Sequence, residues 1–419
     1  MSLNERQITD REIKALQIAA KHKLTRKGNV WFVPSQAGHG EYQVRPDPQA
    51  PRCTCPDFEF RSARCKHIVA VEYVLMRETA PDGSTVVTET VKVTRKTYTQ
   101  DWKAYNAAQT HEKSELQALL YELCKNLPEP VRERGKGRPS LSLPDIVFAS
   151  VTKIYSTISG RRFDTDLREA KARGYLAHLP HYNSVFKYLE SPSLTPYLYE
   201  LISLSAAPLK SIETDFAVDS SGFSTGQFMR WLDVKYGTKE DRRQWLKLHL
   251  MVGVKTNVVT SVEVSDGYAH DYPFFKGLVD RTADVGFKMQ EVSADKGYLG
   301  ASNMLATLQR GAIPYIPFKT NSVPDSRSAT YGPKSELWTR MYHFYALNRA
   351  EFLQHYHKRS NVETTFHMIK AKFGQRLRSR TLTAQINEAL CKVLCHNLCV
   401  VIQSMYELNV TPEFQRETV

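Results

Sequence analysis

Long apolar runs, acidic residues and cysteines are all scarce in this chain. We find no uninterrupted apolar run of the roughly 20 residues that a membrane-spanning helix needs. The opening stretch, MSLNERQITDREIK, is too rich in charge for a secretory signal. We therefore expect a cytoplasmic protein without a membrane partner, whose seven cysteines stay reduced rather than forming a disulfide framework.

The shortage of acids leaves the chain strongly basic. Asp and Glu total 44 against 57 Lys and Arg, which gives a net charge of +13. Such an excess favours a polyanionic partner, although many soluble proteins are basic and charge alone excludes little. The 419 residues are enough for two or three domains of ordinary size.

Four residues of types that bind metals cluster near the N-terminus. Cys53, Cys55, Cys65 and His67 follow the pattern Cys-x-Cys-x9-Cys-x-His, and an apolar helical stretch begins at the histidine. Thiolate and imidazole ligands suit tetrahedral Zn²⁺, and four protein ligands leave no position for a catalytic water. The alternative is a loop of reduced cysteines with a capping histidine. Short strands before the ligands and the helix after them make residues 1–78 resemble a SWIM-type zinc finger, a small α+β structural module.

The other cysteine group has a different pattern. Cys391, Cys395 and Cys399 recur every fourth residue in the apolar segment INEALCKVLCHNLCVVIQSM. A metal site completed by His396 is conceivable. Because the neighbours are apolar, we expect instead a buried helix with small thiol side chains.

The middle of the chain is divided by composition. Residues 79–144 read as a linker with one helix, near 102–126, and a basic segment rich in Pro and Gly. Its KGRP resembles the core of an AT-hook, although one short copy is weak evidence and a basic linker is the better explanation. Residues 145–210 have the pattern of a basic helical cluster, which either binds DNA or supports the next domain.

Two aspartates stand where apolar strands end. Phe216, Ala217 and Val218 run into Asp219, and the segment KMQEVSAD ends a second strand at Asp295. Two further strands and a helix are expected between them. Each aspartate alone would more often be a turn residue.

A third acid lies on a helix with several polar residues at regular spacing. Tyr356, Arg359, Glu363 and Lys370 fall within roughly 60° of one another at 100° per residue. An adjacent apolar stripe could seat this helix on a core; it consists of Val362, Phe366, Ile369 and Phe373. Taken alone, Arg359 and Glu363 could equally be an ion pair on a solvated face.

The order Asp, Asp, then Tyr-x2-Arg-x3-Glu-x6-Lys resembles DDE-class insertion-sequence transposases over roughly residues 140–405. The resemblance implies an α/β fold, with an RNase H-like mixed sheet flanked by helices over 211–410 and a tail at 411–419. It implies that Asp219, Asp295 and Glu363 are catalytic and hold two Mg²⁺ or Mn²⁺ ions. Tyr356, Arg359 and Lys370 would hold DNA phosphates. Lys372 and Arg376 extend the basic run, as further backbone contacts or as a solvated turn.

The activity implied by the resemblance is metal-dependent phosphodiester hydrolysis at transposon ends, followed by strand transfer into target DNA. The expected partners are double-stranded DNA, as element ends and as target, and a second copy of the chain, with the protein on the nucleoid when bound. Three alternatives remain: an inactive transposase-derived DNA-binding regulator, a nuclease of the same fold without strand transfer, and a zinc-stabilised adaptor between proteins.

Overall fold

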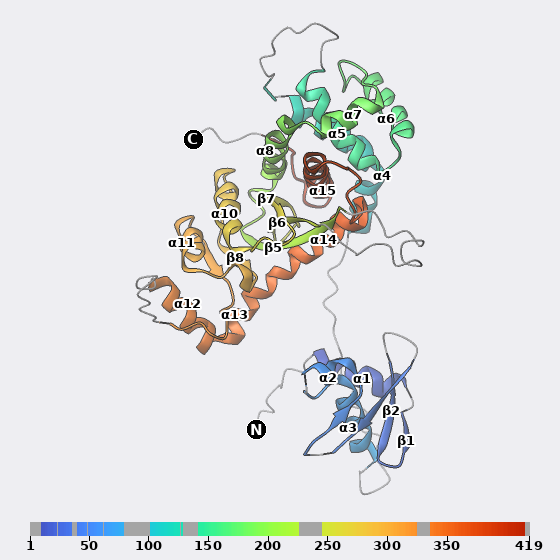
Figure 1. Cartoon of the computed structure of the whole chain (residues 1–419), viewed down its shortest axis with the longest axis vertical. Coiled ribbons are helices and arrows are strands. Elements are labelled where there is room, and N and C mark those ends of the chain that lie inside the picture. The colour runs from blue at the N-terminus through green and yellow to red at the C-terminus, as the bar shows by residue number, and fades with distance from the viewer. Residues whose placement is uncertain are drawn as a thin grey trace. The chain divides into compact units, whose positions relative to one another are not determined.

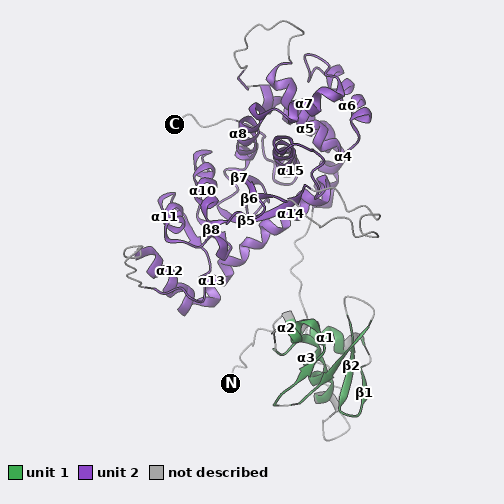
Figure 2. Cartoon of the chain, in the orientation of Figure 1, with its two compact units in different colours: residues 1–97 green, residues 98–419 purple. Residues whose placement is uncertain are grey.

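The computed structural model describes residues 10–22, 24–35, 40–47, 49–61, 63–78, 101–125, 127–128, 141–225, 245–324 and 336–414. The chain forms two compact units, residues 1–97 and 98–419 (Figures 1 and 2). Each unit has its own core, and each is described by itself. The KGRP motif lies outside the described residues.

The first unit is a small antiparallel sheet with helices. Its strands pair in the order β1-β2-β3-β4. Their bounds are β1 Thr25–Lys27, β2 Val30–Pro34, β3 Glu41–Arg45 and β4 Arg52–Cys53. The helices are α1 Asp10–Lys21, α2 Pro56–Arg61 and α3 Lys66–Glu78. Alternation along β2 turns Trp31 and Val33 inward, where they join Ile18 of α1 and Ile68 of α3 in the core.

The second unit is organised by a five-stranded mixed sheet in the order β7-β6-β5-β8-β9. The strands are β5 Asp215–Ser224, β6 Trp245–Gly253, β7 Val259–Asp266, β8 Glu291–Ala294 and β9 Ile313–Tyr315. β5, β6 and β7 are antiparallel, whereas β5, β8 and β9 run parallel. Three antiparallel strands followed by two parallel crossovers make the RNase H-like arrangement that the sequence predicted. Asn257 provides the left-handed residue in the β6–β7 turn.

Helices cover both faces of this sheet. The crossover elements are η3 Tyr272–Phe274, α10 Phe275–Asp284, η4 Lys296–Tyr298 and α11 Ala301–Gln309. Opposite them lies α14 Ser360–Phe373, reached through α12 Glu336–Leu347, α13 Arg349–Tyr356 and the 3-10 helix η5 His357–Arg359. Alternation along β5 separates the faces, because Ser220 contacts Asp271 near η3 while Ser221 contacts Lys370 of α14.

The predicted polar helix is interrupted. We expected one helix through residues 355–373, but α13 ends at Tyr356 and the 3-10 turn η5 separates it from α14. Tyr356 and Arg359 keep right-handed helical dihedrals, so the chain tightens here rather than unwinding. The apolar stripe is confirmed, since Val362, Phe366 and Ile369 are buried.

The helical cluster packs around one long helix, α15 Leu382–Leu408 (Figure 1). Its members are α4 Trp102–Lys125, α5 Leu143–Ser156, α6 Gly160–Ala172, α7 Tyr182–Leu189 and α8 Thr195–Ala206. The helix that the sequence placed in a linker, α4, lies against α15 with Leu116 and Leu120 fully buried. Helices and sheet therefore share one core, although the sequence pointed to separate segments.

The apolar character of α15 corrects one expectation and confirms another. The helix is long and apolar enough to cross a membrane by length and composition, which the sequence analysis had excluded for every run. However, 78% of its most apolar stretch is buried inside the protein, so packing accounts for its hydropathy. Cys391 and Cys395 are fully buried, as the helix interpretation predicted. His396 is engaged elsewhere, at the Asn257 carbonyl.

A buried ion pair fastens the loop after α14 to α15. Gly374, with a positive φ, ends α14, and the loop that follows needs hydrogen-bond partners. The Lys392 ammonium donates to the carbonyls of Gly374 at 2.9 Å and Arg376 at 2.8 Å, and lies 3.4 Å from Glu388. The Glu388 carboxylate accepts from the backbone N–H of Arg378. Both ionic side chains are at most 3% exposed, so each compensates the other's burial.

Lys392→Met should destabilise the second unit by about 3–5 kcal/mol, because it leaves a buried carboxylate without its counter-charge and two carbonyls without donors. Calorimetric unfolding of the full chain measures this. The matched control is Lys276→Met, which removes a lysine whose pair with Asp280 is exposed to solvent. Its effect should stay below about 1 kcal/mol. Equal effects of the two substitutions would contradict a stabilising role for the buried pair.

Candidate active site and zinc cluster

Asp219 and Asp295 lie side by side on neighbouring parallel strands. β5 and β8 are in register at Val218 and Ala294, and each aspartate directly follows one of these residues. The sequence placed Asp219 at the end of a strand, but β5 continues to Ser224, so this carboxylate lies in mid-strand, directly after the buried residues 216–218. Parallel pairing therefore brings together two acids that are 76 positions apart in the chain.

Arg359 links the first acid to the third. One guanidinium nitrogen contacts Asp219, and another lies 2.6 Å from a carboxylate oxygen of Glu363. Since a single guanidinium contacts both carboxylates, Glu363 lies close to Asp219 in the folded chain. The Glu363 side chain is 60% exposed and that of Asp219 only 17%, so the site opens on the Glu363 side.

Burial dominates the electrostatics of Asp219. It raises the pKa of this carboxyl group to about 6. The Ser220 N–H and the Arg359 guanidinium lower the pKa, and the charges of Asp295 and Glu363 raise it further. The raised pKa reflects both a partly desolvated acid and the nearby negative charges, which is the situation that a cation between the three carboxylates would relieve.

Two more predicted residues lie around the acids. The Tyr356 hydroxyl donates to Asp295 at 3.4 Å, and burial raises the pKa of this phenol. Lys370 donates to the Ser221 hydroxyl at 2.6 Å, two residues beyond Asp219 on β5. Burial lowers the pKa of Lys370. The structure thus brings Tyr356, Arg359 and Lys370 to the region around Asp219 and Asp295, despite the turn that interrupts their helix.

The remaining two basic residues are placed differently. Lys372 pairs with Glu112 of α4 and contacts Cys399 of α15, so its ammonium is already neutralised within the helical cluster. The sequence interpretation grouped it with Lys370, whereas the structure places its ammonium beside α4 and α15. Arg376 follows α14, and its backbone forms a bridge with Ser224 at the end of β5.

A second polar network, on the opposite face of β5, was not predicted. Asp271 accepts a hydrogen bond from Ser220 at 2.9 Å and pairs with Lys247 at 2.6 Å. His249 bonds the Tyr298 hydroxyl at 3.0 Å, and burial lowers its pKa to about 4, which keeps the ring neutral. A sequence signal existed, because Lys247 and His249 are polar at alternate positions of an otherwise apolar strand.

Gly297 lies where this network approaches the loop after Asp295. A Cβ atom at this position would stand 2.8 Å from an Asp271 carboxylate oxygen. A larger residue here would therefore require the Asp271 side chain to move.

The four predicted zinc ligands form one buried cluster in the first unit. The ligand atoms of Cys53, Cys55, Cys65 and His67 all lie within 4.8 Å of one another. His67 Nδ1 is 4.0 Å from the Cys53 sulfur and 3.9 Å from the Cys65 sulfur. A tetrahedral zinc site places such atoms about 3.6 Å apart, given the usual bond lengths. The donor set and its geometry therefore fit Zn²⁺, with no fourth position left for water.

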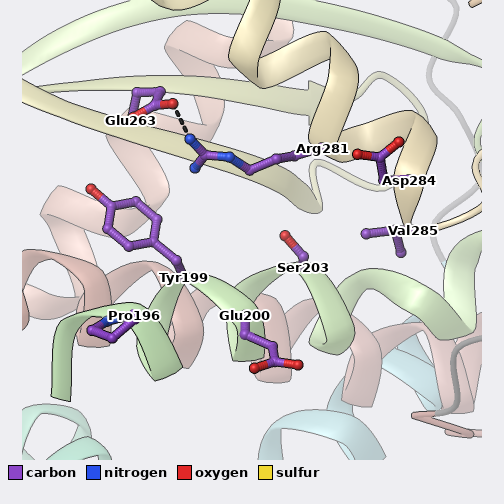
Figure 3. Close-up of a pocket in the computed structure, with 8 residues that line it drawn as sticks. All are labelled: Pro196, Tyr199, Glu200, Ser203, Glu263, Arg281, Asp284 and Val285. Atoms are coloured by element: carbon purple, nitrogen blue, oxygen red, sulfur yellow. Dashed lines mark hydrogen bonds and ion pairs between the residues drawn. The ribbon is translucent and has the colours of Figure 1, made fainter. Parts of the chain in front are cut away.

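A hollow of about 500 Å³ lies away from these sites, between α8 and α10 (Figure 3). Arg281 crosses it, pairs with Glu263 and donates to the Val262 carbonyl at 3.0 Å. This carbonyl belongs to the edge strand β7, so Arg281 covers a backbone group that would otherwise invite another strand. None of the predicted site residues lines this hollow, and we assign it this structural role.

Comparison with known proteins finds matches over both regions of the chain. Residues 210–398 match the family model described as "Transposase DDE domain", and residues 42–76 match the SWIM zinc finger. A solved structure titled "Cryo-EM structure of piggyBac transposase synaptic complex with hairpin DNA (SNHP)" is similar at 10% identity and a TM-score of 0.34. The match covers 74% of this chain and 76% of that one, and at that score it carries no further argument. This chain therefore combines a transposase DDE domain with an N-terminal SWIM zinc finger.

Proposed function

We propose that the chain is an active DNA transposase whose DDE domain cuts phosphodiester bonds at transposon ends and joins the freed ends to target DNA. The observation that carries the proposal is the convergence of Asp219, Asp295 and Glu363 at one edge of the sheet. We assign all three as catalytic residues and as ligands of Mg²⁺ or Mn²⁺.

The donor set fits such ions. Mg²⁺ and Mn²⁺ prefer carboxylate oxygens and retain several waters, and Glu363 faces solvent on the open side of the site. The Arg359 guanidinium lies between Asp219 and Glu363, so this position already accepts positive charge. When bound, a pair of divalent ions supplies an activated nucleophile and neutralises charge on the attacked phosphate.

The chain's own residues would orient the substrate. Arg359 can exchange its carboxylate partners for a phosphate, because a guanidinium binds both kinds of group with two parallel hydrogen bonds. Lys370 provides a positive charge beside Ser221, and Tyr356 provides a hydroxyl group beside Asp295. We add Arg376, whose backbone bridges to the end of β5, and leave out Lys372, whose charge is neutralised elsewhere.

Double-stranded DNA is the proposed partner, as element ends and as target. The net charge of +13 supports a polyanionic substrate. Two ends must be held together for insertion, so we propose a homodimer on DNA. The zinc finger and the helices α5–α8 are the candidate regions for recognising the element ends.

The main alternative is a regulator on an inactive transposase scaffold. It would have no need for three acids at one strand edge, and all three are present here. A nuclease without strand transfer uses the same acids, and only the products of the reaction distinguish it from a transposase.

Asp219→Asn should slow DNA cleavage at least about 100-fold, because the amide removes the charge of the acid that shares Arg359 with Glu363 and follows the residue paired with the one before Asp295. The substrate is a supercoiled plasmid that carries the gene with several hundred base pairs of flanking DNA on each side. Nicked, linear and joined products are separated on a gel in the presence of Mn²⁺ or Mg²⁺.

The control is Asp280→Asn, which changes a half-buried carboxylate of α10 paired with Lys276 and Arg310 and should cleave like the wild type. Binding of the same plasmid fragments should survive Asp219→Asn. Cleavage that persists in this variant would exclude Asp219 as a catalytic residue. Cleaved products that are never joined would favour the nuclease alternative.

Zinc removal should unfold the first unit and leave the second intact, because a unit of this size has little core beyond its metal cluster. We expect about one zinc per chain by elemental analysis, and loss of one calorimetric transition after chelation. Cys65→Ser should lose the zinc. Cys124→Ser is the matched control, since that thiol is buried in the second unit and far from the cluster in sequence. Equal zinc content in both variants would rule out the assigned ligands.

A further inference from the structure

A second charged cluster lies on the same face of the sheet as the proposed catalytic acids. The Lys358 ammonium lies 2.7 Å from a carboxylate oxygen of Asp215 and 2.6 Å from one of Glu291. His355 lies 2.8 Å from the other oxygen of Glu291, and its ring stacks on Tyr315 at 4.3 Å between centroids. The cluster thus joins α13 and η5 to the three parallel strands β5, β8 and β9.

The two acids of this cluster precede the two proposed catalytic aspartates by the same number of residues. Asp215 opens β5 four residues before Asp219, and Glu291 opens β8 four residues before Asp295. Residues four apart on a strand share a face and are separated by about 13 Å. The cluster therefore holds the start of both strands, four residues before each proposed catalytic aspartate.

The ion pairs of Lys358 are partly shielded from solvent. The side chains of Lys358, Asp215 and Glu291 are at most 30% exposed, so solvent screens their attraction less than on an open surface. Burial raises the pKa of Glu291, but hydrogen bonds from Lys358 and His355 prevail and the pKa is lowered. The carboxylate is thus ionised and fully engaged at neutral pH.

The ion pairs of Lys358 bear on the proposed active site, because the residues that follow Lys358 in sequence belong to that site. Arg359 is the next residue and contacts Asp219, and Glu363 follows within the first turn of α14. The segment 355–363 is therefore attached to β5 and β8 at two levels, through Lys358 at the strand starts and through Arg359 and Tyr356 at Asp219 and Asp295, four residues further along.

We propose that Lys358 is a positioning residue, which sets the rotation and height of the start of α14 so that Glu363 meets Asp219 and Asp295. This inference rests on the proposed function for its consequence, whereas the attachment itself stands on the contacts above. Nothing in the Tyr-Arg-Glu-Lys spacing assigns this lysine, and it contacts none of the three proposed metal ligands.

The test compares Lys358→Met, Lys358→Arg and Lys113→Met in the full chain. Lys113 is the matched control, because its ammonium also lies 2.9 Å from each of two carboxylates, those of Asp166 and Glu169, but in the helical cluster. One readout is Mn²⁺ affinity without DNA, measured by titration calorimetry. The other is hydrogen–deuterium exchange of peptides covering 355–363.

Lys358→Met should weaken Mn²⁺ binding about tenfold, as loss of a residue that orients a metal ligand does, and should speed exchange in 355–363. Lys358→Arg should recover most of both, and Lys113→Met should change neither. A Lys358→Met protein with wild-type affinity and wild-type exchange would overturn the proposal, as would an equal effect of Lys113→Met.

Asp219→Asn separates this inference from the proposed function. If wild type and Asp219→Asn bind Mn²⁺ equally, the metal site is wrong, and the exchange readout alone still decides whether Lys358 holds the segment. Should Lys358→Met not fold, Asp215→Asn and Glu291→Gln each remove one anchor and should shift both readouts in the same direction by about threefold. Wild-type behaviour of both variants would overturn the proposal.

Discussion

Repulsion between like charges is the constraint on which the second unit of this protein depends. Three carboxylates meet at the edge of one sheet, and the partial burial of Asp219 makes their negative charge costly. In the structure, Arg359 offsets part of that cost by contacting Asp219 and Glu363 together. This arrangement suits a cation of higher charge, because Arg359 already holds the acids close together.

The same principle recurs away from the acids, with fixed cations in place of exchangeable ones. Lys358 compensates Asp215 and Glu291 at the strand starts, and Lys392 compensates Glu388 within the helical cluster. These pairs tie α14 at both of its ends, first to the sheet and then to α15. The helix that carries Glu363 is therefore positioned by charge as well as by its buried apolar stripe.

The first unit meets a different constraint. Its strands are short and its core contains few large side chains, so burial alone contributes little stability. The gathering of three thiols and one imidazole offers a metal ion that would hold the turn before α2 and the start of α3 together. Stability in this unit would then come from coordination, whereas in the second unit it comes from a large shared core.

Much of this architecture follows from local patterns in the chain. An apolar run before aspartate predicts that a buried strand carries Asp219, although β5 runs on to Ser224, and the Cys-x-Cys-x9-Cys-x-His spacing predicts the cluster of four ligands. Both depend on near neighbours in sequence. The apolar stripe of α14 was readable for the same reason. Hydrophobic periodicity reports which side of an element is buried.

Other features depended on contacts between distant segments. The break at η5 is one such feature. The ion pairs of Lys372 with Glu112 and of Lys358 with Asp215 and Glu291 are others, and they join residues 67 to 260 positions apart. No periodicity encodes such partners, since each is chosen by how the sheet and helices pack. The chain itself thus determined the residue types that converge, and the tertiary structure decided which charges meet, because electrostatic energy depends on distance in space and not along the sequence.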